Sequence, residues 1–221
     1  MLALGVCLAA ACSGDDEAPV TTVAVADEVV LARADAAIES RTTMRAEWSL
    51  VSSYGDQRTV VGEASAVVDL AAGTGVLDVA GSAEPGAGTG QQIVVVGDRA
   101  FRRDDGGAWE ASTDTLVEVA LPGFDEEGDD TVAALARIIS AAPGPWTATA
   151  TDHLMRYRST DPTTGTLVEL DIDADGHLVR LARSQPPFGL DVDDLLRVGT
   201  EADFSDFDTA SVSLPPGLPV D

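Results

Sequence analysis

The chain has 221 residues, of which 45% are hydrophobic, and its 38 acidic residues outnumber the 13 basic ones. A formal net charge of −25 argues against nucleic acid as a partner, because phosphate backbones are bound by basic surfaces. Direct docking of the protein surface on anionic lipid headgroups is disfavoured for the same reason. The length and apolar content predict one domain whose core folds without disulfides or metals.

An apolar run of small residues opens the chain and ends at Cys12, which Ser13 and an acidic stretch follow. A membrane span needs about 20 apolar residues, so this shorter run is typical of the end of a signal peptide. Leu8-Ala-Ala-Ala-Cys12 resembles the lipobox of bacterial lipoproteins, whose cysteine receives a diacylglyceryl thioether. The alternative is an ordinary secretory signal, or a truncated membrane helix, with an incidental cysteine.

The lipobox interpretation divides the chain into three parts. Residues 1–11 are the expected lipoprotein signal segment, residues 12–25 the lipidated tether, and residues 26–221 one folded domain. Cys7 falls in the removed segment, so the mature chain keeps Cys12 alone and forms no internal disulfide. We therefore expect a protein that is lipid-anchored through Cys12 at the outer face of the cytoplasmic membrane or in the cell envelope.

The first half of the domain reads as one helix and a series of strands. Apolar residues recur at three- and four-residue steps over residues 26–39, which predicts an amphipathic helix. Alternation of apolar and polar residues then predicts half-buried strands. These cover residues 44–50, 58–70, 75–82, 92–96, 100–103 and 109–112, with glycine- and aspartate-rich turns between them.

The second half repeats this order. Asp129 or Asp130 can cap a helix with an apolar face, which Pro143 ends. Strands are expected over residues 146–151, 154–159, 166–173 and 177–183, and a closing segment runs from Phe204 to residues 212–214. Helix, meander, helix and meander together predict an α+β fold built on one antiparallel sheet.

One acidic run looks like a metal site. Asp171, Asp173, Asp175 and Gly176 copy the opening of a calcium-binding EF-hand loop. The closing bidentate glutamate is missing, because Ala182 stands at that position within an alternating strand pattern. We therefore expect a β-hairpin and no metal site.

Signals for catalysis are missing from the sequence. The chain has two histidines and no nucleophile elbow, phosphate-binding loop or zinc spacing. Its densest acidic stretch, residues 124–130, is a charge run typical of a solvated loop. We expect no enzyme, no catalytic residue and no cofactor.

Several short motifs resemble those of a known lipoprotein family. An aliphatic strand, a Gly-Asp turn and an aromatic residue run from Ile93 to Phe101, and Gly107-Ala-Trp109 follows. The hairpin Asp173-Ala-Asp-Gly-His-Leu-Val-Arg180 and the closing Phe204-Ser-Asp-Phe207 add to the pattern. Together they resemble the actinobacterial LppX/LprAFG lipoproteins of the LolA/LolB-like group, over about residues 26–216.

That resemblance implies a strongly curved antiparallel sheet, a half-barrel, with helices packed on its concave face. It also implies a monomer that carries the acyl chains of a lipid or glycolipid in a hydrophobic cavity. The cavity candidates are apolar residues expected on the covered face of the sheet and on the second helix: Trp48, Leu50, Ala64, Ala66, Val68, Leu70, Val132, Leu135 and Ile139. Since close packing is the usual state of protein interiors, a surface-anchored interaction or sensory module with a filled core is the alternative.

Overall fold

The computed structural model describes residues 21–39, 41–81, 90–124, 130–151, 153–187 and 196–219. The expected signal segment, Cys12 and most of the expected tether lie outside the described residues.

The described residues form three helices and twelve strands. The helices are α1 (Asp27–Glu39), α2 (Leu116–Ala120) and α3 (Thr131–Ser140). The strands before α2 are β1 (Thr22–Val25), β2 (Thr43–Tyr54), β3 (Gln57–Asp69), β4 (Thr74–Val79), β5 (Gln91–Val96), β6 (Arg99–Asp104) and β7 (Glu110–Ser112). Those after α3 are β8 (Trp146–Ala150), β9 (Leu154–Thr160), β10 (Leu167–Asp173), β11 (Leu178–Gln185) and β12 (Leu196–Ser205).

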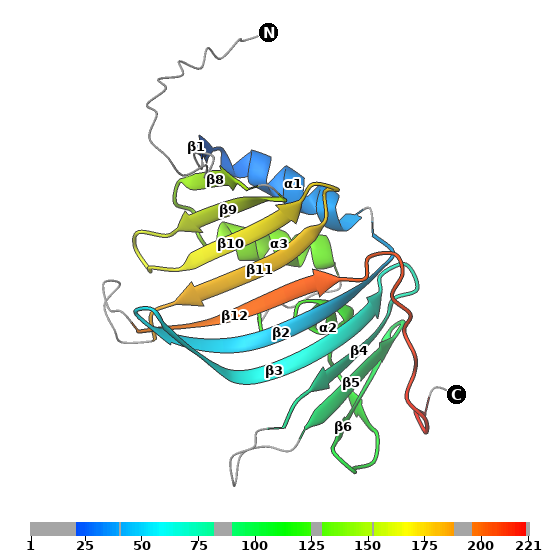
Figure 1. The fold of residues 1–221 in the computed structure, drawn as a ribbon. Coiled ribbons are helices and arrows are strands. Elements are labelled where there is room, and N and C mark those ends of the chain that lie inside the picture. The colour runs from blue at the N-terminus through cyan, green and yellow to red at the C-terminus, as the bar shows by residue number, and fades with distance from the viewer. Residues whose placement is uncertain are drawn as a thin grey trace, which may run out of the picture.

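All twelve strands belong to one open antiparallel sheet, in the order β1-β8-β9-β10-β11-β12-β2-β3-β4-β5-β6-β7. The last strand, β12, lies in the middle, between β11 and β2 (Figure 1). The expected α+β class and single antiparallel sheet are therefore confirmed. The half-barrel curvature and the concave face stay predictions.

Alternation along β2 and β3 decides which residues face the helices. Ala46 pairs with Ala66 and Trp48 with Ala64, so the small residues of both strands share one face. A register shift follows at Leu50, where the ladder moves on to the pair Val51 and Val60. Such a bulge turns the residues beyond it to the other face of the sheet. Val60 was expected on the same face as Ala64, but because of the bulge it points away from the helices and is exposed.

Three elements differ from the sequence analysis. Residues 22–25, assigned to the tether, form β1 and pair with β8. The short helix α2 begins with a capping box between Thr115 and Glu118, a Thr-x-x-Glu signal that the period-based analysis passed over. The closing segment was expected to begin at Phe204, but the strand β12 begins at Leu196, because Val198, Ala202 and Phe204 alternate with charged residues that face away from the helices.

The three helices lie on one side of the sheet (Figure 1). Helix α2 packs on β3, β4 and β5, whereas α3 packs against α1 and α2. Buried apolar side chains from the helices and from the sheet form one continuous cluster, which includes Val30, Leu135, Trp146 and Leu170. This core joins the two halves of the sheet through the helices.

A bulky side chain at Ala66 tests how closely the core is packed. Ala66 is 1% exposed and lies between Ala46 and Leu77, so Ala66→Trp should lower the free energy of unfolding by about 1–3 kcal/mol or more. Urea denaturation measures the change. Ser65→Trp is the matched control, since Ser65 is half-buried and its side chain points to the other face. Unchanged stability with reduced lipid uptake in Ala66→Trp would instead indicate open space beside Ala66.

Candidate functional site

The sheet brings most of the predicted site residues onto one face. By strand register, Trp48 and Leu50 of β2 share the helix-facing side with Ala64, Ala66 and Val68 of β3. Leu70, just beyond the end of β3, is partly buried against the same core. The sequence therefore placed this group correctly relative to the sheet.

The predicted residues differ in how deeply they are buried. Ala66, Val68, Leu135 and Ile139 are buried in the continuous core. None of the four hollows described here is lined by any of these four residues. The side chain of Val132 lies outside the described residues.

The helix that lies directly over β3 and β4 is α2, although the sequence analysis expected the second predicted helix, now α3, in that place. A Cβ at Gly75 of β4 would come within 2.8 Å of Val119 and 3.0 Å of Leu116, both in α2, and within 3.0 Å of Val68. The absence of a side chain at Gly75 therefore allows α2 to sit closely on the sheet.

Trp48 lies between two glycines. A Cβ at Gly62 would be 3.9 Å from its indole ring, and a Cβ at Gly123 would be 2.2 Å from its Nε1. Gly123 also has φ +76°, so a side chain there is excluded by both space and backbone conformation. The indole Nε1 is buried and has no hydrogen-bond partner among the described residues. Most buried tryptophan N–H groups have a hydrogen-bond partner. Because the Nε1 of Trp48 has none among the described residues, no hydrogen bond of its N–H group to them holds this ring in place.

Next to Trp48, a hollow of about 200 Å³ opens on the helix-facing side of the sheet. Leu50 of β2 and Val198 of β12 line it together with Gly123 and Phe124. Leu50 is 38% exposed and Val198 36% exposed, although both point to the face that the helices cover elsewhere. The sheet thus leaves apolar surface uncovered at this end.

Two hydrogen bonds hold the segment with Gly123 against the sheet. Thr200 Oγ1 donates to the carbonyl oxygen of Gly123 at 2.7 Å, and Arg183 Nη1 donates to that of Phe124 at 3.5 Å. Both donors come from strands beside the hollow, β12 and β11. They define one wall of the hollow, and no motif in the sequence indicated them.

Two larger hollows have different linings. One of about 650 Å³ lies across the middle of β2 and β3 and the ends of β4, β5 and β6. It includes Trp48 and Ala64, but most of its lining is polar or charged, as at Glu47, Asp78 and Arg103. The other, of about 600 Å³, lies between α1 and the β10–β11 turn and mixes apolar with charged residues. The hollow at Leu50 is mixed as well, because Arg183, Ser184, Gln185 and Thr200 line it beside Leu50 and Val198.

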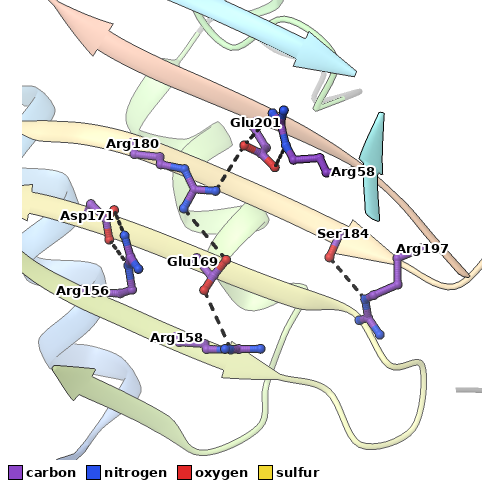
Figure 2. Close-up of polar contacts among 9 residues, drawn as sticks. All are labelled: Arg58, Arg156, Arg158, Glu169, Asp171, Arg180, Ser184, Arg197 and Glu201. Atoms are coloured by element: carbon purple, nitrogen blue, oxygen red, sulfur yellow. Dashed lines mark hydrogen bonds and ion pairs between the residues drawn. The ribbon is translucent and has the colours of Figure 1, made fainter. Parts of the chain in front are cut away.

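The opposite face of the sheet carries a network of arginines and carboxylates (Figure 2). Glu201 of β12 accepts from Arg58 and from Arg180, each at 3.2 Å. Arg180 also lies 3.9 Å from Glu169, which is itself 3.9 Å from Arg158. The network therefore ties β9, β10, β11, β12 and β3 together across the face away from the helices.

Its most buried pair is Arg156 and Asp171. The Asp171 side chain is 3% exposed and accepts two hydrogen bonds from the guanidinium, at 2.8 and 2.7 Å. The hydrogen bond to Asp171 outweighs burial and raises the pKa of Arg156 above its ordinary value. Asp171 therefore serves a structural role, as the partner of Arg156 in a bidentate ion pair.

Burial raises the pKa of Glu201, but the hydrogen bonds and charges of Arg58 and Arg180 outweigh burial and lower it below its ordinary value. A carboxyl group with a lower pKa in the folded state stabilises the fold above its unfolded pKa of roughly 4.3. That contribution is lost as the pH falls through the folded-state pKa.

We therefore expect Glu201→Gln to be less stable than the parent at pH 7, and this difference to shrink as the pH falls below about 4. Urea denaturation at several pH values measures both quantities. Glu63→Gln is the control, because Glu63 is an exposed glutamate elsewhere in the same sheet. A stability difference that stays constant down to pH 3 would contradict the proposed role of the ion pairs.

The acidic run from Asp171 lies at the β10–β11 hairpin, as the sequence analysis expected. Ligand atoms of Asp173, Asp175 and His177 lie within 4.8 Å of one another. Asp173 Oδ1 accepts from the backbone N–H groups of Asp175 and His177, and Oδ2 lies 2.9 Å from His177 Nδ1. These contacts close the turn, and the His177 ring stacks on Phe207 at 4.6 Å. The expectation that no metal binds here stays a prediction.

Comparisons with known proteins place the chain only loosely. No protein-family model matches it, and no curated protein does. Among solved structures it is similar to the LolA superfamily protein NE2245 from Nitrosomonas europaea, with a TM-score of 0.33 and 11% identity, over 86% of this chain and 96% of that one. These values are too low to transfer a family or a function. The assignment to the LppX/LprAFG family stays a prediction.

None of the described helices is long and apolar enough to span a membrane. The lipid anchor expected at Cys12 lies outside the described residues.

Proposed function

We propose that this protein is a lipid-anchored extracytoplasmic carrier that binds the acyl chains of a lipid or glycolipid on the helix-facing side of its sheet. The supporting observation is the exposed apolar surface of Leu50 and Val198 beside the hollow at Gly123. Apolar surface of this kind is stabilised when an acyl chain covers it, by roughly 0.8 kcal/mol for each buried methylene.

The hollow itself is smaller than the roughly 300–1,000 Å³ typical of ligand sites. A whole acyl chain therefore needs more space, and Trp48 is the side chain that can provide it. A side chain at Gly62 would be in ordinary contact with its ring, a side chain at Gly123 would clash with it, and its Nε1 has no hydrogen bond to lose among the described residues. Displacing the indole would extend the hollow along the small residues of β2 and β3.

The alternative is a surface-anchored interaction or sensory module without a ligand. The burial of Ala66, Val68, Leu135 and Ile139 in the core favours it, because none of them lines any of the four hollows described above. The two functions differ in one measurable respect: a carrier takes up lipid, and an interaction module does not.

Native mass spectrometry and organic extraction of the purified protein test the carrier. We expect copurified lipid on the parent, and at least about tenfold less on the double variant Leu50→Asp, Val198→Asp, because a buried carboxylate beside an acyl chain costs several kcal/mol. Leu214→Asp is the matched control, since Leu214 is 42% exposed and not among the residues that line this hollow. Equal lipid on all three proteins would remove this surface from the site. No lipid on any of them, even after incubation with lipid, would leave the interaction module.

The anchor has a separate test. With a full-length signal in place, Cys12→Ser should move the protein to the soluble fraction or leave it unprocessed, because the thioether has no other acceptor in the expected mature chain. Mass spectrometry of the parent N-terminal peptide should show lipid on Cys12. An unmodified Cys12 would refute the anchor without affecting the carrier test.

A further inference from the structure

The geometry points to an oxyanion-binding site on the face of the sheet away from the helices, centred on Arg197 and shaped for a group of the size of phosphate. Its hollow shares Arg183, Ser184 and Gly199 with the hollow at Leu50, but the proposal does not depend on the acyl-chain surface.

Five of the 13 basic residues of this acidic chain gather in the region drawn in Figure 2. They are Arg58, Arg156, Arg158, Arg180 and Arg197. The same region contains three carboxylates, Glu169, Asp171 and Glu201, all of which are paired with arginines. The hollow beside Arg197 is lined by three arginines and three carboxylates, so its surroundings are far less negative than the chain as a whole, which carries a formal charge of −25.

Arg197 is the arginine whose charge is not balanced. Its Nε donates to Ser184 Oγ at 3.4 Å, and its Nη2 donates to the carbonyl oxygen of Gly165. No carboxylate among the described residues forms an ion pair with it. Burial, followed by repulsion from Arg158, lowers the pKa of Arg197. A partly buried cation that repels its neighbour is stabilised by an added anion.

A hollow of about 210 Å³ adjoins Arg197 and has an apolar floor. Val51 and Ala182 are buried there, although their side chains point away from the helices. Charged residues, including Arg58 and Glu201, form the rim. This space fits a small ligand group and is too small for a whole lipid.

The chemistry of guanidinium favours an oxyanion. Its planar fork matches phosphate and carboxylate oxygens with two parallel hydrogen bonds, and Arg197 has N–H groups beyond the two that donate to protein oxygens. Three carboxylates also line the hollow: Glu169 and Glu201, each with two arginines against it, and the exposed Asp56. At physiological salt, charges more than about 8 Å away are largely screened, so most of the overall negative charge acts only weakly on Arg197.

Calorimetric titration with inorganic phosphate, in chloride buffer of constant ionic strength, tests the site on the full chain carrying Cys12→Ser. We expect saturable binding at one site and a Kd that rises about tenfold or more in Arg197→Gln. Arg197→Lys should also bind more weakly, because an ammonium lacks the planar fork. Arg45→Gln is the matched control, since Arg45 is a half-exposed arginine paired with Asp206 away from this hollow.

A second arm distinguishes free phosphate from a lipid headgroup. Vesicles of phosphatidylglycerol and of phosphatidylcholine are tested for displacement of bound phosphate. Displacement by phosphatidylglycerol alone would assign the site to anionic headgroups. No displacement would assign it to free phosphate. If circular dichroism shows that Arg197→Gln does not fold, Arg158→Gln takes its place. The exposed Arg158 side chain supplies the second positive charge, so this variant should also bind phosphate more weakly than the parent. Absence of phosphate binding and of headgroup binding in the parent, or equal binding by the parent and the folded Arg197 variants, would overturn the proposal.

Discussion

The pairing of β12 with both β11 and β2 is the constraint on which the rest of the structure depends. These two ladders join the strands that follow α3 to those that precede α2, and β12 is the last strand of the chain. The close approach requires Gly199, because a Cβ there would lie 2.5 Å from the carbonyl oxygen of Arg183 and 2.7 Å from the Cβ of Ser184. The sheet is therefore complete only when nearly the whole chain is present.

The two faces of the sheet have different chemistry because strand residues alternate. Small side chains such as Ala46, Ala64 and Ala66 face the helices and allow α2 to approach closely. On the other face, the same strands carry the arginine and carboxylate network (Figure 2). The side chains of Leu50 and Val198 and that of Arg197 thus lie on opposite sides of the central strands, although the hollows beside them share Arg183, Ser184 and Gly199 in their linings.

The network also explains how an acidic chain without lysine keeps a stable sheet. Each arginine carries several N–H donors in a fixed plane, so Arg180 reaches both Glu169 and Glu201. Exposed ion pairs of this kind contribute little individually, about 0–1 kcal/mol. Their shared carboxylates instead link five strands and hold the register of β12.

The sequence alone determined the α+β class, the helices at α1 and α3, and the face shared by Trp48, Ala64 and Ala66, because these depend on local periodicity. It could not place β12 at the centre of the sheet, since the charged residues Glu201 and Asp203 resemble a solvated segment until the arginine partners of Glu201 are known. Nor could it show that α2 covers β3, that Val68 is fully packed, or that Arg197 has no carboxylate partner among the described residues. Those properties arise from contacts between residues far apart in the chain, which only the tertiary structure brings together.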